Sequence, residues 1–320
     1  MSNLICWGHN PGQRYVKDTL TIGGARKDLR PYPAIIAPWA ASDDTGLSRK
    51  VKDLTATLGD KHYIGGAAAE RLPMGNRQMA NGRLEANSPV YQAFAQMSAQ
   101  HAGLKNKPQM LIATALPVAW RDANAEEQIK AHLRAGLHGL VTIKDIYVQS
   151  EPNAVIGYEM LDDAGQIRAD QAALAKGLVC VGDIGGATLN RSVVDGLRAL
   201  AGEAASPLLG SRQVVRALMQ QSGGQYVDAE RRLEAVVAGN TTDPAAAALL
   251  AQYREVVIGE LQQAWSSYKP VAYLFAGGTA HWLADDLKRA FKGARIVANP
   301  QQAIAIGLWR YARRKALRGA

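Results

Sequence analysis

Aromatic residues make up only 6% of this 320-residue chain, and it has just two cysteines. Cys6 and Cys180 both lie in apolar runs and have no metal-ligand spacing, which argues against a zinc site or a disulfide framework and favours buried, reduced thiols. No stretch approaches the roughly 20 apolar residues of a membrane span, and the N-terminus lacks the regions of a signal peptide. We therefore expect a cytoplasmic protein with no membrane partner.

The content of 48% hydrophobic and 20% charged residues is typical of a globular protein, and the length allows two domains. A formal charge of +9 raises the question of nucleic-acid contact. The excess is spread along the chain, with one concentration at Arg310, Arg313, Arg314, Lys315 and Arg318. On a helix these residues fall around much of the circumference. We interpret them as a solvated basic helix, with contact to a polyanion or an acidic partner as the alternative.

Strand-like and helix-like segments alternate along the chain, which is the pattern of an α/β protein. The first strands are predicted at Leu4–Trp7 and Tyr15–Ile22, with "GHNPG" as the turn between them. Later expected segments are a helix at 88–101, a strand at 110–115, a helix with a capping box at Asn124 and Glu127, a strand over "VTIKDIYVQ", a helix-rich region at 206–267, a strand over "PVAYLFAGG", and a closing helix after Asn299–Pro300.

Two strand-to-loop junctions contain paired glycines. In "CVGDIGGATLN" the strand leads to Asp183, Gly185–Gly186 and Thr188, and in "YLFAGGTAHWL" it leads to Gly277–Gly278 and a helix start. Glycine lets a backbone approach a ligand closely, and the free N–H groups of a helix N-terminus attract an anion. Taken alone, each junction is more often a packing turn than a phosphate site.

A third junction, "VQSEPNAVIGYEML", places the carboxylate of Glu151 at the end of a strand and the start of a helix. Open α/β sheets bind ligands at the carboxyl ends of their strands, where a glutamate would position a water for attack on a γ-phosphate. The alternative is a carboxylate that merely stabilises a helix N-terminus.

The order of these stretches resembles the ParM/StbA family of actin-like plasmid-segregation ATPases, within the actin/Hsp70/sugar-kinase superfamily. The resemblance extends from about residue 110 to 315 and is carried by "IATALPVAW", "IKDIYVQSEPNAVIGYEML", "CVGDIGGATLN", "LLGSRQVVRAL", "YLFAGGTAHWL" and "ANPQQAIAIGLWRYA". Before residue 110 it is thinner, with "RPYPAIIAPWA" and "YIGGAAAE" as the similar parts. The ordered set is more specific than any one stretch.

This resemblance implies an α/β, actin-like (ribonuclease H-like) fold with a nucleotide cleft between two domains. Domain I would comprise residues 1–175, with a variable subdomain at about 30–87, and would be completed by the helix at 301–320. Domain II would comprise residues 176–300.

The resemblance also implies ATP and Mg²⁺ as cofactors and gives roles to individual residues. Asp183 would act on the metal through water, and Glu151 would orient the hydrolytic water. Backbone and hydroxyl contacts would come from Gly8 in the first phosphate loop, Gly185, Gly186 and Thr188 at the β- and γ-phosphates, and Gly277 and Gly278 on the adenosine side. Such a site works by positioning and by neutralising charge.

The sequence departs from the family pattern at the first phosphate loop, which usually reads Asp-x-Gly-x-Gly-Asn-x-Lys. In "LICWGHNPGQRYVKD" Cys6 or Trp7 stands about where the aspartate belongs. Asn190 also replaces a usual acidic residue, and Ala187 replaces a common threonine. Losing the first-loop aspartate would reduce or abolish hydrolysis, while binding through backbone groups would survive.

The resemblance therefore predicts a filament-forming ATPase that segregates plasmid DNA through a DNA-binding adaptor, with subunits joined head to tail. The alternative is a nucleotide-binding scaffold that does not hydrolyse ATP and contacts DNA or an acidic partner. A sugar-kinase-like phosphotransferase is disfavoured, because no sugar-recognition cluster is evident. His9 and His101 are interpreted as solvated or satisfied histidines rather than catalytic groups.

Overall fold

The computed structural model describes residues 4–12, 14–39, 54–72, 76–79, 88–200 and 202–319. The chain divides into two compact units. Unit 1 comprises Met1–Ser150, Leu161–Ile167 and Ile304–Ala320, and unit 2 comprises Glu151–Met160 and Arg168–Ala303. The domain bounds predicted near residues 175 and 300 remain a prediction, and part of the predicted variable subdomain lies outside the described residues.

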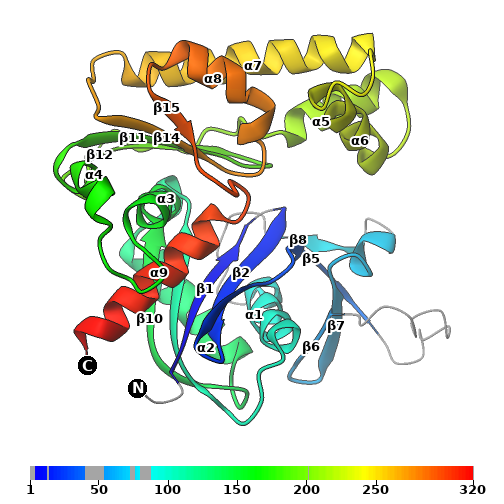
Figure 1. Ribbon diagram of the computed structural model, residues 1–320. Coiled ribbons are helices and arrows are strands. Elements are labelled where there is room, and N and C mark those ends of the chain that lie inside the picture. Colours follow the sequence, from blue (N-terminus) through cyan, green and yellow to red (C-terminus); the bar gives the residue numbers. More distant parts are fainter. Residues whose placement is uncertain are drawn as a thin grey trace. The chain divides into compact units, whose positions relative to one another are not determined.

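The main sheet of unit 1 has the strand order β10-β9-β1-β2-β3, with β4 paired to β2 (Figure 1). Its strands are β1 (Leu4–Pro11), β2 (Tyr15–Ile22), β3 (Ala25–Asp28), β4 (Tyr32–Pro33), β9 (Gln109–Leu116) and β10 (Thr142–Ser150). The central strand β1 runs parallel to β9 and antiparallel to β2. The carboxyl ends of β1, β9 and β10 therefore lie at one edge of this sheet.

Among its described residues, unit 1 also contains a small sheet and the helices α1, α2 and α9. The small sheet has the order β6-β7-β5-β8. Its strands are β5 (Ile35–Pro38), β6 (Leu54–Leu58), β7 (Lys61–Gly65) and β8 (Gln78–Met79), and the helices are α1 (Pro89–Ala102), α2 (Ala123–Gly136) and α9 (Ala303–Arg318). Short 3-10 turns occur at Ala69–Arg71 and Val118–Trp120.

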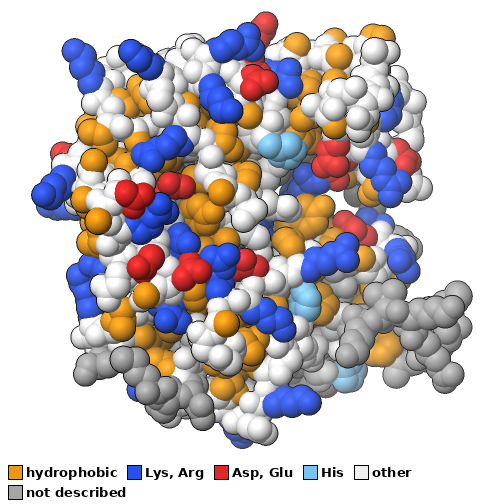
Figure 2. All heavy atoms as spheres, in the orientation of Figure 1, with side chains coloured by type: hydrophobic (Ala, Val, Ile, Leu, Met, Phe, Trp, Pro, Cys, Tyr) orange, Lys and Arg blue, Asp and Glu red, His pale blue; other side chains and the backbone are white. Residues whose placement is uncertain are grey.

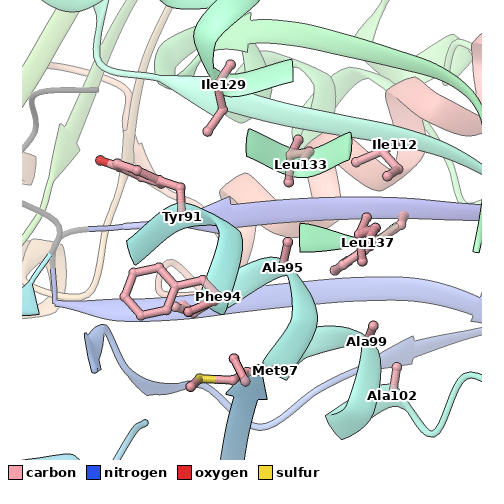
Figure 3. Packing of buried hydrophobic residues seen from close by; sticks show 14 of the residues in the cluster. Tyr91, Phe94, Ala95, Met97, Ala99, Ala102, Ile112, Ile129, Leu133 and Leu137 are labelled. Carbon is pink, nitrogen blue, oxygen red and sulfur yellow. The ribbon is translucent and has the colours of Figure 1, made fainter. Parts of the chain in front are cut away.

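One face of the main sheet in unit 1 is covered by α1 and α2. Figure 3 shows Phe94 and Met97 of α1 and Leu133 of α2 packed in one apolar cluster, to which Ile112 of β9 also belongs. Ile129, Leu133 and Leu137 follow one another at four-residue spacing, and all three are fully buried in this cluster. This cluster anchors the sheet that carries β1.

The other face of β1 packs against α9. A β-carbon added at Gly8 would collide with the carbonyl oxygen of Ala305 and lie 2.5 Å from the backbone nitrogen of Trp309. The Trp309 indole also donates a hydrogen bond of 2.9 Å to the hydroxyl of Thr21 on β2. Glycine at position 8 thus allows the helix backbone to touch the strand directly.

Most basic residues of α9 contact their own unit. Arg310 donates to Asp163 at 2.7 Å, and Arg314 donates to the Gly165 carbonyl at 3.3 Å. Arg313 lies over the Trp309 ring, and Lys315 lies over the ring of Tyr311. These contacts support the interpretation of this segment as an ordinary basic helix.

Unit 2 contains a five-stranded sheet of order β13-β12-β11-β14-β15. Its strands are β11 (Leu178–Ile184), β12 (Leu189–Asp195), β13 (Arg198–Ala199), β14 (Ala272–Ala276) and β15 (Ala294–Ile296). Its helices are α3 (Glu151–Met160), α4 (Ala172–Lys176), α5 (Arg212–Ser222), α6 (Tyr226–Val237), α7 (Pro244–Trp265) and α8 (Ala284–Ala290), with 3-10 turns at Ala169–Gln171 and Ala280–Leu283. A second apolar cluster joins this sheet to α5–α8, with Trp265 packed against Phe275 and Phe291.

Two local predictions are wrong. Gly8 to Pro11 of the predicted "GHNPG" turn belong to β1, where His9 and Asn10 pair with β2. Pairing with strands on both sides outweighs the turn preference of Asn-Pro-Gly. The predicted capping box is replaced by Asp122, which accepts a hydrogen bond of 2.7 Å from the Ala125 amide, so the helix begins one residue before Asn124.

The two cysteines are free and buried, as predicted, and burial raises the pKa of the Cys6 thiol to about 11 and that of Cys180 to about 12. None of the helices in the described part of the chain has the length and apolarity that a membrane crossing needs.

Candidate functional site

The first glycine junction of unit 2 is a tight hairpin. β11 and β12 are antiparallel, and their register places Asp183 opposite Asn190 and Ile184 opposite Leu189. The Gly185 amide donates to the Thr188 carbonyl at 2.9 Å and closes the connection between the strands. Residues 185–187 are partly exposed at the tip, whereas Asp183 is buried. The hairpin therefore presents a short glycine loop directly beside a buried carboxylate.

The carbonyls of this glycine loop are held by the start of α5. The amide of Gly210 donates to Ala187 at 3.1 Å, that of Ser211 to Gly185 at 3.2 Å, and that of Arg212 to Gly186 at 2.7 Å. A β-carbon at Gly210 would collide with the backbone of Gly186 and Ala187. These backbone hydrogen bonds and the close packing of Gly210 constrain the conformation of the loop.

Glu151 and Asp183 meet at the side chain of Asn190. The Asn190 amide nitrogen Nδ2 donates to Glu151 Oε2 at 2.5 Å and to Asp183 Oδ2 at 3.2 Å. It also lies 3.3 Å from the hydroxyl oxygen of Thr188. All four side chains are at least nine-tenths buried. The structure therefore brings two carboxylates from separate elements, the start of α3 and the end of β11, to one point.

The second glycine junction lies against the first. Gly277 follows β14 with φ +93°, and a β-carbon there would collide with the Ile184 carbonyl and lie 2.7 Å from Asp183 Oδ1. The amide of Thr279 donates to the Ile184 carbonyl at 3.1 Å. Gly278, by contrast, has only Gln301 side-chain atoms near it, at 3.6 Å or more. Both glycine pairs, Thr188 and the two carboxylates thus form one site within unit 2.

The segment predicted to form the first phosphate loop has a different local structure from the one expected. Cys6 and Trp7 lie in the middle of β1 and are buried, and Gly8 faces the backbone of α9. The strand ends instead at Asn10 and Pro11. The sequence prediction does not include Asn10 among the site residues, because it places "GHNPG" in a turn. A strand that extends to Pro11 puts Asn10 at the strand end.

Asn10 is 1% exposed, and its Nδ2 has no hydrogen-bond partner among the described residues. A buried amide donor without a partner is unusual and suits an anionic or hydrated ligand. The residues of β1 include no carboxylate.

Asp18, the acidic residue of the neighbouring strand β2, is buried in unit 1. Asp18 Oδ1 accepts hydrogen bonds from the Trp7 indole at 2.9 Å and pairs with His9 Nδ1 at 2.7 Å. Its Oδ2 accepts from the Ser98 hydroxyl at 2.6 Å. This network gives His9 Nδ1 a partner, whereas the buried Nε2 of His9 has none among the described residues. The network also occupies both oxygens of Asp18.

The unit 2 site offers oxygen donors, the ligand type that Mg²⁺ prefers. They are the carboxylates of Glu151 and Asp183, the hydroxyl of Thr188, and the Asn190 Oδ1, which is buried and has no partner among the described residues. No cluster of three His, Cys, Asp or Glu side chains suited to a metal occurs in the described ranges. Two carboxylates, a hydroxyl and an amide oxygen are a donor set that fits Mg²⁺, which would need further ligands from water or phosphate.

Several solved structures have the same fold over nearly the whole chain. An archaeal actin homologue, Ta0583, in complex with ADP superposes with a TM-score of 0.74 at 14% identity, covering 97% of this chain and 99% of that one. Bacillus thuringiensis ParM, solved with ADP and with ATP, gives TM-scores of 0.69 and 0.66, both at 14% identity, covering 100% and 99% of this chain and all of ParM. An Alp12 filament structure gives 0.66 at 14% identity, covering 98% of this chain and 100% of that one.

No family model matches the chain, and no curated protein matches it significantly. At these identities the likeness establishes the fold, and the predicted actin-like fold is confirmed.

Proposed function

We propose that this chain, which has the actin-like fold, binds ATP with Mg²⁺ and assembles head to tail into filaments in the cytoplasm. ATP hydrolysis would regulate filament stability, and the filaments would segregate plasmid DNA through a DNA-binding adaptor. Two neighbours of the same fold were solved with ADP or ATP, and one was solved as a filament. The observation that carries the proposal is the meeting of Glu151 and Asp183 beside both glycine loops.

In this proposal the hairpin of unit 2 binds the phosphates. The partly exposed Gly185 and Gly186 allow a phosphate to approach the backbone, and the Thr188 hydroxyl donates to a phosphate oxygen. Asp183 would hold Mg²⁺ through water, and the ion would supply positive charge for the phosphate oxygens. Glu151 accepts a hydrogen bond from the attacking water and orients it. Gly277 and Gly278 contact the adenosine side.

The chain's own residues would do little more than bind and position. Glu151 and Asp183 already lie within hydrogen-bond reach of one amide, so no large rearrangement is needed to bring them together. Positioning of this kind accounts for most of the catalysis in phosphoryl transfer.

A second candidate function is a scaffold that binds nucleotide without hydrolysing it. The specific observation in its favour is the end of β1, where Asn10 stands and no carboxylate is present. An amide there can donate to phosphate or to a hydrated ion but adds no negative charge to a metal site. The scaffold would contact DNA or an acidic partner. On the face that Figure 2 shows, Lys and Arg are interspersed with Asp and Glu and form no single basic patch.

The decisive experiment measures polymer and phosphate release together. The wild-type chain is incubated with Mg-ATP, Mg-ADP or no nucleotide, then assayed by pelleting, light scattering and phosphate release. We expect polymer with ATP, less with ADP, and Glu151→Gln to slow phosphate release about 100-fold or more while polymer persists longer. The same monomeric behaviour in all three conditions would refute the filament proposal.

The rate of phosphate release distinguishes the ATP-hydrolysing filament protein from the scaffold that does not hydrolyse ATP. ATP binding with negligible release that Glu151→Gln leaves unchanged would favour the scaffold. Release that depends on Glu151 would exclude it.

A further inference from the structure

Thr279, in the loop after β14, contacts the glycine hairpin of unit 2 through two of its groups. Its amide donates to the Ile184 carbonyl at 3.1 Å, and its hydroxyl Oγ1 donates to the Gly185 carbonyl at 3.2 Å. Thr279 is 2% exposed. One residue thus binds two consecutive carbonyls of the hairpin, although Gly185 lies 94 positions earlier in the sequence.

The hydroxyl of Thr279 does not act within its own loop. Thr279 directly precedes the 3-10 turn Ala280–Leu283. A threonine before a helical turn ordinarily accepts a hydrogen bond from an amide of that turn, but the Thr279 side chain makes no such bond to this described turn. Its single hydroxyl proton goes to Gly185 instead. The side chain therefore links two separate loops.

The Gly185 carbonyl is also bound by α5. It accepts a hydrogen bond of 3.2 Å from the Ser211 amide as well as the one from Thr279. A carbonyl oxygen has two lone pairs and can accept both bonds at once. The Ser211 bond comes from the backbone and survives side-chain substitution, whereas the Thr279 bond comes from a side chain. The contribution of Thr279 can therefore be removed by itself.

The two loops begin next to each other because their strands are neighbours. β11 and β14 run parallel, with Asp183 opposite Ala276, so both chains leave the sheet at the same edge. Beyond that edge each loop contains paired glycines, whose backbone has more conformational freedom than that of other residues. Contacts beyond the strand ends must therefore set the spacing of the two loops.

We propose that Thr279 is a positioning residue whose hydroxyl links the loop after β14 to the glycine hairpin and fixes their spacing. The link itself stands on the contacts above. Its meaning for nucleotide rests on the proposed function, in which the hairpin binds the phosphates and Gly277 and Gly278 contact the adenosine side. Thr279 then sets the spacing of the two loops before nucleotide arrives, so less conformational freedom is lost on binding.

The test measures hydrogen exchange in the nucleotide-free full chain, so it gives a result whether or not the chain binds ATP. The reporting amides are Gly185, bonded to the Thr188 carbonyl, and Ser211, bonded to the Gly185 carbonyl. Valine has the shape of threonine without the hydroxyl, and serine keeps the hydroxyl. Thr279→Val should make both amides exchange about 5- to 10-fold faster, the effect of one neutral hydrogen bond. Thr279→Ser should stay within about twofold of wild type.

The order of the two variants separates positioning from simple packing. If only packing mattered, serine would have the larger effect, because it deletes a buried methyl group that valine keeps. The matched control is Thr57→Val in unit 1, which removes the 3.0 Å hydrogen bond between the Thr57 hydroxyl and His62 and should leave both reporting amides unchanged. If Thr279→Val does not fold, Thr279→Ala compared with Thr279→Ser answers the same question, because alanine and serine differ by the hydroxyl alone.

Calorimetric titration with Mg-ATP adds a nucleotide readout. Thr279→Val should bind ATP about 5- to 10-fold more weakly, and Thr279→Ser should stay within about twofold of wild type. Equal exchange in Thr279→Val and wild type, or faster exchange in Thr279→Ser than in Thr279→Val, would overturn the proposal. Absence of ATP binding in wild type would count against the proposed function alone, because the exchange rates would still test the link.

Discussion

Replacing Gly8 with alanine should destabilise unit 1 by about 3 kcal/mol, the upper part of the range for overpacking a core. The new methyl group would meet backbone atoms of α9, the Ala305 carbonyl and the Trp309 amide. Backbone atoms cannot rotate away as a side chain can, so the helix itself would have to move. That shift would also disturb the hydrogen bond from Trp309 to Thr21.

Denaturant unfolding of the two variants Gly8→Ala and Gly259→Ala measures this effect against a matched control. Gly259 lies within α7, and a β-carbon there would have no atom within 4 Å. The same substitution should therefore stabilise the chain there by about 0.5–1 kcal/mol, because alanine favours the helix. If Gly8→Ala unfolds within about 0.5 kcal/mol of wild type, the packing of α9 on β1 is not as described.

Replacing Gly277 with alanine should abolish ATP binding and destabilise unit 2 by about 2–4 kcal/mol. A residue with a side chain is strained at φ +93°, and the methyl group would collide with the Ile184 carbonyl and press on Asp183 Oδ1. The strain alone costs about 1–3 kcal/mol. The collision adds to it and displaces the carboxylate that we assign to Mg²⁺.

The neighbouring Gly278 gives the control. It has no positive φ, and a β-carbon there would meet only the Gln301 side chain at ordinary contact distance. Gly278→Ala should fold like wild type and weaken nucleotide binding by about tenfold or less, through crowding on the adenosine side. Calorimetric titration with ATP, together with unfolding midpoints, checks both variants. Equal behaviour of the two substitutions would contradict the geometry of this loop.

The sequence predicted the two glycine junctions of the site well, because each has a local signature of apolar strand, paired glycines and a polar residue. In the structure, a β-carbon added at Gly277 would lie 2.7 Å from Asp183 Oδ1, although a long helical region separates the two residues in the sequence. The nucleotide role of these residues and the cleft expected between the domains remain predictions.

Asn190 could not be given its bridging position from the sequence. Its two partners lie 39 and 7 residues away, and only the register of β11 with β12 turns its side chain toward both. A pattern of residue types shows that an amide replaces an acid but not what the amide contacts. Strand register and helix placement supply that information.

The surroundings of Gly8 could not be predicted from the sequence either. A glycine in or after an apolar strand gives the same sequence pattern whether it faces a phosphate or a helix. The neighbour of Gly8, Trp309, lies far along the chain. Asp18 is similar, since a carboxylate on a strand gives no sign that a tryptophan, a histidine and a serine will fill its bonding positions.

The packing of β1 against α9 has a consequence for how the chain folds as it is made. Thr21 and Trp309, joined by a hydrogen bond, are separated by 288 positions. A ribosome adding about 5–20 residues per second needs on the order of 15–60 s to cover that distance. During this interval one face of the first sheet has no helix to cover it, and Gly8 exposes bare backbone there. Unit 1 must therefore complete its fold after α9 emerges, and until then the uncovered face of its sheet is open to aggregation.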